Sequence, residues 1–247
     1  MNLPVPDQRD KVSLIILTLN EIQAVRTIFA SIPFQEVDET FVVDGGSTDG
    51  TVGFFEERGI PVYIQPKPGH GEAYKYGMQK ASYETLVFFS GDGNEKPADI
   101  PRMVAKMREG YDLVIASRFG YGEKSYDVTP VRLLGNYFFT FLVNFRFGIK
   151  LKDIFNAFRG LRKESMRKMD LQESFFQSEL EMGMKACHMG MRIGDFSTVE
   201  QARCGGVEKL QTVRDGFDNL KCFFKYWNPP RLQRHHSHVQ AVARDAK

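Results

Sequence analysis

VVDGGSTDGT, residues 42–51, joins the end of an apolar run to a turn rich in glycine and in hydroxyl and carboxyl side chains. Glycine lets the backbone turn sharply, and Ser, Thr and Asp side chains can cap a helix that follows. The stretch therefore predicts a strand, a tight turn and a helix. Two interpretations fit it: a well-capped junction of ordinary turn chemistry, or a site where Asp44 accepts hydrogen bonds from the base or ribose of a nucleotide.

The alternation of strand and helix continues on both sides of this stretch. We expect strands at residues 12–17, 40–43, 62–65, 86–89 and 113–116, and helices at residues 21–32, 72–81 and 100–108, with another through Phe54, Phe55 and Arg58. The strands are short apolar runs without in-and-out alternation, which is typical of a parallel sheet covered on both faces. This pattern predicts a doubly wound α/β sheet with ligands at the carboxyl ends of its strands.

The second half of the chain is less regular and richer in phenylalanine. It predicts helices at residues 130–149 and 173–189 and a strand within residues 192–200. We expect a single domain over residues 11–227, preceded by an extension at residues 1–10 and followed by a polar tail at residues 228–247.

Composition excludes several classes of protein. The 247 residues include 33 Lys and Arg against 31 Asp and Glu, for a net charge of +2, whereas a general nucleic-acid binder is usually strongly basic. Three cysteines without a CxxC pair argue against a disulfide framework or a zinc knuckle and favour a reducing cytosol. No signal peptide and no apolar run long enough for a membrane span are visible. We expect a cytoplasmic protein without a nucleic-acid partner.

Two further motifs follow predicted strands or open predicted helices. FFSGDGNE, residues 88–95, ends a strand with Asp92, Asn94 and Glu95, whose oxygens suit a hard cation such as Mg²⁺, although a polar turn would look the same. PGHGEA, residues 68–73, is a glycine-rich loop that opens a helix, where backbone N–H groups could meet an anion.

These motifs belong to a series of short blocks that runs through most of the chain. The blocks are residues 18–21, 42–51, 69–77, 92–94, 116–119, 132–136, 153–159, 176–180 and 203–209. In their order and spacing they resemble the GT-A glycosyltransferases of family 2, and within them the polyprenyl-phosphate (dolichyl-phosphate mannose synthase-like) hexosyltransferases. The resemblance implies the GT-A fold, a Rossmann-like, mixed but mainly parallel sheet flanked by helices in one domain.

The resemblance also implies an activity and its residues. A hexose would pass from a GDP- or UDP-sugar to a polyprenyl-phosphate acceptor with inversion, assisted by Mg²⁺ or Mn²⁺. The implied nucleotide-sugar contacts are Thr18, Leu19, Asn20, Glu21, Asp44, Gly46, Ser47, Gly71, Lys75, Asp92, Gly93, Arg203 and Lys209. The implied catalytic residues are Asp92, Arg118, Arg132 and Glu179, and the implied metal ligands are Asp92 and Asn94. Asn94 departs from the family's Asp-x-Asp signature, and Gly45 stands where many relatives carry a second acid.

The acceptor is open to three interpretations. Arg118 and Arg132 match positions that face an acceptor phosphate, which is already anionic and needs no strong base. A hydroxyl acceptor, on a glycan or small metabolite, would instead need a carboxylate base, for which Glu179 or Asp153 is the candidate. A domain that binds a nucleotide sugar without turnover is the third.

The helix expected at residues 130–149 bears on the same question. Asn136, Thr140 and Asn144 form one polar line along it, and its other faces are apolar. This pattern fits a core helix with a polar edge. It also fits an interfacial helix at lipid headgroups, which would give the protein peripheral membrane contact.

Overall fold

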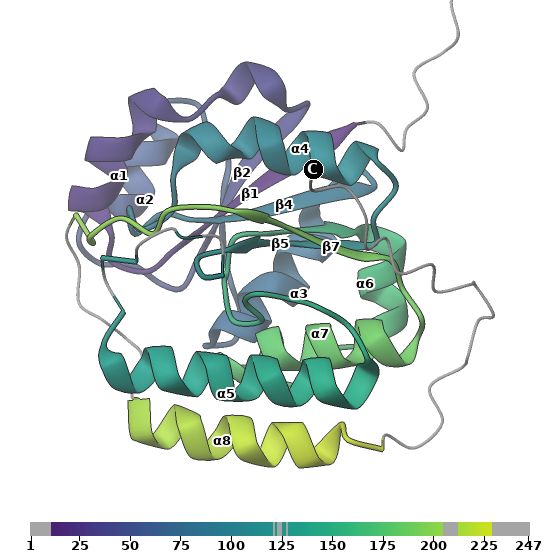
Figure 1. Cartoon of the computed structure of the whole chain (residues 1–247). Coiled ribbons are helices and arrows are strands. Elements are labelled where there is room, and N and C mark those ends of the chain that lie inside the picture. Colours follow the sequence, from purple (N-terminus) through teal and green to yellow (C-terminus); the bar gives the residue numbers. More distant parts are fainter. Residues whose placement is uncertain (1–10, 121, 123–124, 127, 205–211, 229–247) are drawn as a thin grey trace, which may run out of the picture.

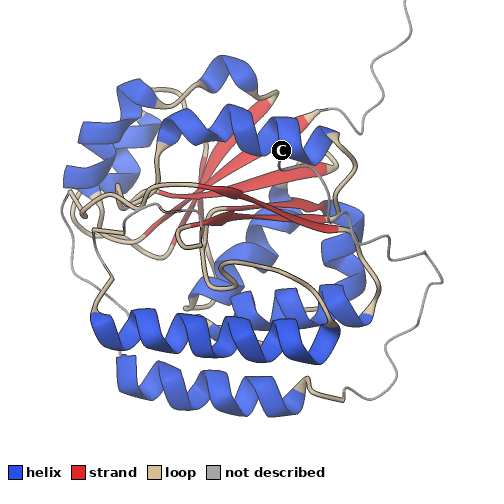
Figure 2. Cartoon of the chain, in the orientation of Figure 1, coloured by secondary structure: helices blue, strands red, loops and turns tan. Residues whose placement is uncertain are grey.

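A mixed seven-stranded sheet with helices on both faces organises the chain (Figures 1 and 2). The computed structural model describes residues 11–120, 122, 125–126, 128–204 and 212–228. Its strands are β1 (Val12–Thr18), β2 (Glu39–Asp44), β3 (Val62–Ile64), β4 (Thr85–Ser90), β5 (Leu113–Ser117), β6 (Arg159–Arg162) and β7 (Ile193–Ser197). Its helices are α1 (Ile22–Ile28), α2 (Thr51–Glu56), α3 (His70–Lys80), α4 (Ile100–Arg108), α5 (Pro130–Phe147), α6 (Lys163–Met169), α7 (Gln177–His188) and α8 (Thr212–Lys225).

The strand order β3-β2-β1-β4-β6-β5-β7 confirms the predicted α/β class. The pairs β1–β2, β1–β4, β2–β3 and β5–β7 are parallel, and only β6 runs antiparallel to its neighbours β4 and β5. The carboxyl ends of the parallel strands β1, β2, β4 and β5 therefore meet at one edge of the sheet, where a doubly wound sheet binds its ligands.

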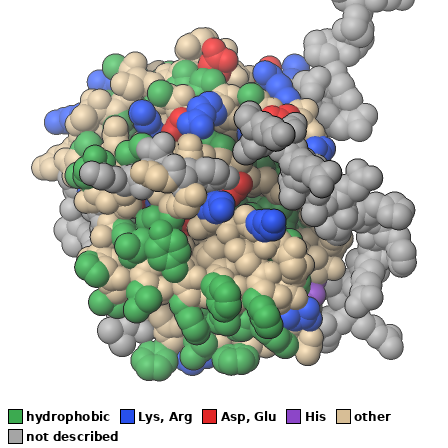
Figure 3. All heavy atoms as spheres, in the orientation of Figure 1, with side chains coloured by type: hydrophobic (Ala, Val, Ile, Leu, Met, Phe, Trp, Pro, Cys, Tyr) green, Lys and Arg blue, Asp and Glu red, His purple; other side chains and the backbone are tan. Residues whose placement is uncertain are grey.

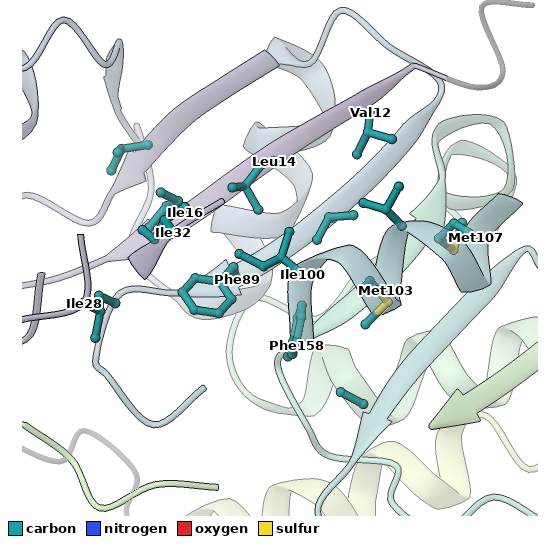
Figure 4. Packing of buried hydrophobic residues seen from close by; sticks show 14 of the residues in the cluster. Val12, Leu14, Ile16, Ile28, Ile32, Phe89, Ile100, Met103, Met107 and Phe158 are labelled. Atoms are coloured by element: carbon teal, nitrogen blue, oxygen red, sulfur yellow. The ribbon is translucent and has the colours of Figure 1, made fainter. Parts of the chain in front are cut away.

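Both faces of the sheet are buried, which explains the uniformly apolar strands. Leu14 and Ile16 of β1 belong to the core under α4, where Figure 4 shows them near Ile100 and Met103. The intervening residue Ile15 belongs to the opposite core, formed with α3, α6 and α7. Successive side chains of a strand point to opposite faces, so a strand between two helical layers needs an apolar residue at every position.

Several element boundaries differ from the sequence-based expectations. The helix predicted at 21–32 is α1 followed by a 3₁₀ turn, Phe29–Ser31, and the helix predicted at 173–189 begins only at Gln177. The helix predicted at 130–149 ends at Phe147, because Gly148 adopts φ +67° and stops it. Strand β6 and helices α6 and α8 were not predicted. The proposed extension at 1–10 and nearly all of the proposed tail at 228–247 lie outside the described residues.

Helix α5 turns its polar line inward. Asn136 and Thr140 are buried, and the Asn136 Nδ2 atom donates to Asp153 Oδ1 over 2.8 Å. Asn144 exchanges two hydrogen bonds with the backbone of Leu151, at 2.8 and 2.9 Å. Two apolar residues of α5 are buried with this polar line, whereas six large apolar or aromatic side chains of the helix are exposed. Among the described helices, none combines the length and apolarity needed to cross a bilayer.

Candidate active site

A cavity of about 440 Å³ opens at the carboxyl edge of the sheet. This volume lies within the range of roughly 300–1,000 Å³ that small-molecule sites occupy. Nine of the residues predicted from the sequence line it: Thr18, Leu19, Glu21, Asp92, Asn94, Arg118, Arg132, Glu179 and Arg203. Segments far apart in the sequence therefore converge on one site.

Asp44 lies beside this cavity but not in its wall. Its carboxylate is fully buried and accepts hydrogen bonds from Thr18 Oγ1 (2.7 Å), the backbone N–H groups of Gly46 (2.8 Å) and Ser47 (2.6 Å), and Ser47 Oγ (2.6 Å). The contact between this carboxylate and a nucleoside stays a prediction, which this arrangement does not favour because the carboxylate oxygens already accept four hydrogen bonds. Asp44 instead holds the loop in shape, and its neighbours Val43 and Gly45 line the cavity.

The loops after β1 and β2 are joined to each other by further hydrogen bonds. Asn20, at φ +55°, donates its backbone N–H to Ser47 Oγ over 2.7 Å. Its side-chain oxygen accepts from the N–H of Thr48 over 2.8 Å. Asn20, Gly46 and Ser47 thus position the cavity wall from behind rather than forming it.

The carboxylate of Asp92 forms an ion pair with Arg203, and both residues line the cavity. Asp92 Oδ2 lies 3.2 Å from Arg203 Nη2, and Arg203 Nη1 lies 3.8 Å from Glu21 Oε1. Asp92 Oδ1 also accepts from the N–H of Asn94 over 3.0 Å. This part of the site combines acidic oxygens with a guanidinium, a pairing suited to a group that carries both a cation and phosphates.

Glu95 follows this turn but does not offer a ready carboxylate. Burial and the nearby Asp92 carboxylate raise the pKa of Glu95 well above its ordinary value, although Arg118 opposes the rise. Glu95 Oε2 accepts the N–H of Ser90 over 2.6 Å, so this side chain closes the end of β4.

The residues at Asp92 fit a divalent cation that arrives with a diphosphate. No cluster of three or more His, Cys, Asp or Glu side chains suited to a metal occurs in the described part of the chain. Mg²⁺, however, usually takes only one or two carboxylates and completes its shell with water and substrate phosphates. The Asp92 carboxylate and the amide oxygen of Asn94 are hard ligands of this kind, and both residues line the cavity.

Arg118 is fixed by two acids. Its Nε lies 2.7 Å from Asp153 Oδ2 and its Nη1 lies 3.0 Å from Glu200 Oε1. Burial alone would raise the pKa of Asp153, but Arg118 and the hydrogen bonds to this carboxylate outweigh it and lower the pKa. Asp153 is therefore an ionised, fully buried partner of Arg118 and is not placed to act as a base in the cavity.

Glu179 is a carboxyl of the cavity whose pKa is raised to near neutral. Burial raises the pKa of Glu179 to about 7, with a contribution from Asp153, while Arg159 and Arg118 oppose the rise. Glu179 Oε1 lies 3.4 Å from His70 Nε2, which also lies 3.1 Å from the hydroxyl of Tyr74. Glu179 and His70 both line the cavity.

The loop at 68–73 does not present its N–H groups to the cavity. The N–H groups of Gly71 and Glu72 both donate to the carbonyl of Ser174, over 2.9 and 3.3 Å. A Cβ atom at Gly71 would lie 2.3 Å from the carbonyl oxygen of Glu173, so glycine is required for this close approach. Lys75 pairs with Glu72 over 2.6 Å. Donor contacts of Gly71 and Lys75 stay predictions that this arrangement does not favour.

The remaining predicted residues and two missed ones complete the site. Gly93, at φ +82°, lies where a Cβ would come within 3.0 Å of Cys204 Sγ, and Lys209 lies outside the described residues. His70 and Glu200 were not predicted as site residues. His70 stands inside the PGHGEA motif, which is a usable signal, whereas Glu200 has none in its local sequence.

Comparison with known proteins gives a consistent result. The family model described as "Glycosyl transferase family 2" matches residues 13–170. Glycosyltransferase AglJ of Haloferax volcanii is 28% identical over 218 residues, covering 87% of this chain and 70% of its own length. Undecaprenyl-phosphate mannosyltransferase of Micrococcus luteus is 27% identical over 200 residues, covering 74% and 80%. The crystal structure of glucosyl-3-phosphoglycerate synthase from Mycobacterium tuberculosis with Mn²⁺ and UDP-glucose superposes with a TM-score of 0.72 at 20% identity, covering 90% and 80%. This likeness shows that the chain has the same GT-A-like fold.

Proposed function

The chain belongs to glycosyltransferase family 2, and on this premise we propose that it transfers a hexose from a nucleoside-diphosphate sugar to a polyprenyl-phosphate acceptor with inversion. One observation carries the proposal. A single cavity is lined by the acid and arginine pair Asp92 and Arg203 and also by two further arginines, Arg118 and Arg132. Such a cavity offers separate cationic groups for a leaving diphosphate and for an incoming phosphate.

The donor would bind at Asp92. In the reaction the bond between the anomeric carbon and the diphosphate oxygen breaks, and the nucleoside diphosphate leaves with the electron pair. Groups that stabilise the growing negative charge on the leaving oxygens lower the barrier. A divalent cation held by Asp92 and Asn94 would supply positive charge to this diphosphate. Arg203, 3.2 Å from Asp92, would add its guanidinium to the same oxygens.

The acceptor phosphate would bind at Arg132, beside Arg118. A phosphate monoester carries at least one negative charge at neutral pH, so its oxygen attacks the anomeric carbon without prior loss of a proton. Arg118 is held rigidly by Asp153 and Glu200, which also offset its charge, so it can direct its remaining N–H donors at the phosphate while Arg132 supplies the main attraction. The apolar residues Val128 and Phe175, which also line the cavity, would contact the first isoprene units.

A hydroxyl acceptor is a second candidate, because of Glu179. A hydroxyl must lose its proton as it attacks, and a base works best when its pKa is close to the working pH. Glu179, with its pKa raised to about 7, meets that requirement and lines the same cavity.

A transfer assay separates the two acceptors. The protein is incubated with Mn²⁺ and labelled UDP- or GDP-hexoses, and with polyprenyl phosphate in detergent micelles or soluble glycan acceptors. We expect label in the organic phase with polyprenyl phosphate and loss of that label in Asp92→Ala. The control Glu109→Ala, at a half-exposed acid just after α4, should transfer normally. Label found only in a water-soluble product would reject the lipid acceptor and support the hydroxyl acceptor.

A further inference from the structure

Helix α5 is apolar on the side that faces away from the protein. Its large outward side chains are Val131, Leu134, Tyr137, Phe138, Phe141 and Phe145, each between 48 and 74% exposed. The inward side carries the buried polar residues Asn136 and Thr140 together with the buried apolar residues Phe139 and Val143. The outward side of a surface helix in water is normally polar, whereas that of α5 is apolar. Helix α5 therefore presents a surface suited to an apolar neighbour, and the described part of the chain does not cover that surface.

Helix α8 extends the same surface. Its outward apolar residues Phe217, Leu220 and Phe224 are 63, 36 and 66% exposed. Figure 1 shows α8 running beside α5, and the ring centroids of Phe139 in α5 and Phe223 in α8 lie 6.5 Å apart. Just after α8, the carbonyl of Trp227 accepts a hydrogen bond from Arg146 Nη2 of α5 over 3.2 Å. We call the six residues of α5 and the three of α8 the α5/α8 face. Figure 3 shows hydrophobic side chains gathered over this edge of the molecule.

Cations accompany the apolar residues of this face. Arg214, Lys221 and Lys225 are exposed on α8, and Lys150 is exposed just after α5. Two of these lysines are ion-paired, Lys221 with Asp218 over 3.0 Å and Lys225 with Glu173 over 2.6 Å. In both pairs the acid is the less exposed partner, at 28% against 79% and at 22% against 53%. Exposed Phe and Leu with Lys and Arg alongside is the pattern of a helix that lies in the interface of an anionic membrane.

We propose that the α5/α8 face seats this protein on the surface of an anionic phospholipid bilayer. Exposed apolar patches of this extent are uncommon on a protein that stays in water, and they mark contact surfaces. A second copy of the chain is the other apolar occupant. A two-fold contact through this face would bring the exposed cations of both copies into one interface, which is unfavourable because it adds like charges to a buried surface. An anionic lipid surface pairs with those cations instead.

Membrane binding through the α5/α8 face would also determine how the cavity is oriented relative to the bilayer. Arg132 stands in the first turn of α5 and lines the cavity, as does Phe175, which is 52% exposed. On a bilayer the opening beside these two residues would lie at the level of the headgroups. The value of this orientation for a lipid acceptor rests on the proposed function. Membrane binding through α5 and α8 does not depend on which acceptor is used.

Vesicle flotation tests the proposal without donor or acceptor. The whole chain is floated with vesicles of phosphatidylcholine alone or of phosphatidylcholine and phosphatidylglycerol at about 3:1, at low and at high salt. We expect binding to the anionic vesicles that weakens as salt screens the cations. The double substitution Phe141→Ser and Phe145→Ser should weaken that binding about tenfold or more, because membrane affinity scales with the apolar area inserted. Its thermal unfolding should match wild type, since both side chains are mostly exposed.

Matched variants make each outcome decisive. Ile64→Ser removes an apolar side chain of β3 that is 49% exposed and lies outside the face, and it should float like wild type. Asp92→Ala should also float normally, so loss of transfer and loss of binding are distinguishable. The proposal is overturned if wild type does not float, or if the double variant floats equally well. A third outcome also overturns it: sedimentation velocity finds a dimeric wild type and a monomeric double variant, and neither protein binds vesicles.

Discussion

Substituting Gln for Glu179 should change how the stability of the protein depends on pH. The carboxyl is buried at the cavity, 5% exposed and 3.4 Å from His70 Nε2, and its pKa in the folded protein is raised from 4.5 to about 7. The folded state thus holds this proton more tightly than the unfolded chain. Its contribution to stability is full below pH 4.5, falls as the pH rises toward 7, and stays low above that value.

The size of the effect follows from the two pKa values. The difference between about 7 and 4.5 is about 2.5 units, which corresponds to about 3 kcal/mol at pH 8.5. Gln has nearly the same shape and never ionises. Glu179→Gln should therefore be more stable than wild type by up to about 3 kcal/mol at pH 8.5 and equally stable near pH 4.5. In a domain of this size that is a difference in Tm of about 6–12 °C.

Thermal and urea unfolding between pH 4.5 and 8.5 measure this difference directly. The control is Glu109→Gln, at a carboxyl that is 50% exposed, and its curve should run parallel to wild type. A constant offset between Glu179→Gln and wild type at every pH would refute the reasoning about burial. The same variant also separates the acceptors: transfer to a phosphate should change little, whereas transfer to a hydroxyl should fall about 10²- to 10⁴-fold.

Three other changes test the site around this carboxyl. Asp153→Asn should destabilise the protein by about 3 kcal/mol, since it leaves the guanidinium of Arg118 with one acid fewer in a buried pair; an unchanged Tm would contradict this. Arg203→Gln should tighten Mn²⁺ binding about fivefold in the absence of nucleotide, measured by paramagnetic resonance, because it removes a cation 3.2 Å from Asp92; equal affinities would speak against that pairing. Arg132→Ala should raise the KM for the acceptor about tenfold or more and the KM for the donor much less, and equal effects would remove its phosphate-binding role.

Local sequence was sufficient for most of the parallel part of the sheet, because β1, β2, β4 and β5 each contain a continuous apolar run. Strand β6 has no such run. Its first residue, Arg159, is fully buried and donates from its guanidinium to the carbonyl oxygens of Ile154, Asn156 and Glu179. The Glu179 carbonyl reaches Arg159 only in the folded chain. Arginine is usually a surface residue, so its sequence gives no sign that this side chain is buried in the core. Helix α8 was missed because apolar residues lie on both of its sides: Phe217, Leu220 and Phe224 are exposed, whereas Cys222 and Phe223 are buried.

The site residues that come just after the carboxyl ends of strands could be predicted from the sequence. Asp92 and Arg118 come directly after β4 and β5, so their convergence could be foreseen from the order of the strands. Asp44 also ends a strand, yet its carboxylate is taken up by the backbone N–H groups of the following loop. Glu200 could not be found, because it reaches Arg118 across 82 residues of sequence.

The most direct test of the central claim is a crystal structure of the protein with a nucleoside-diphosphate hexose and Mn²⁺. We predict that the diphosphate lies in the cavity between Asp92 and Arg203, with the cation joining it to the Asp92 carboxylate. A nucleotide bound elsewhere on the molecule, or a diphosphate out of reach of Asp92 in the occupied cavity, would contradict the proposed donor site.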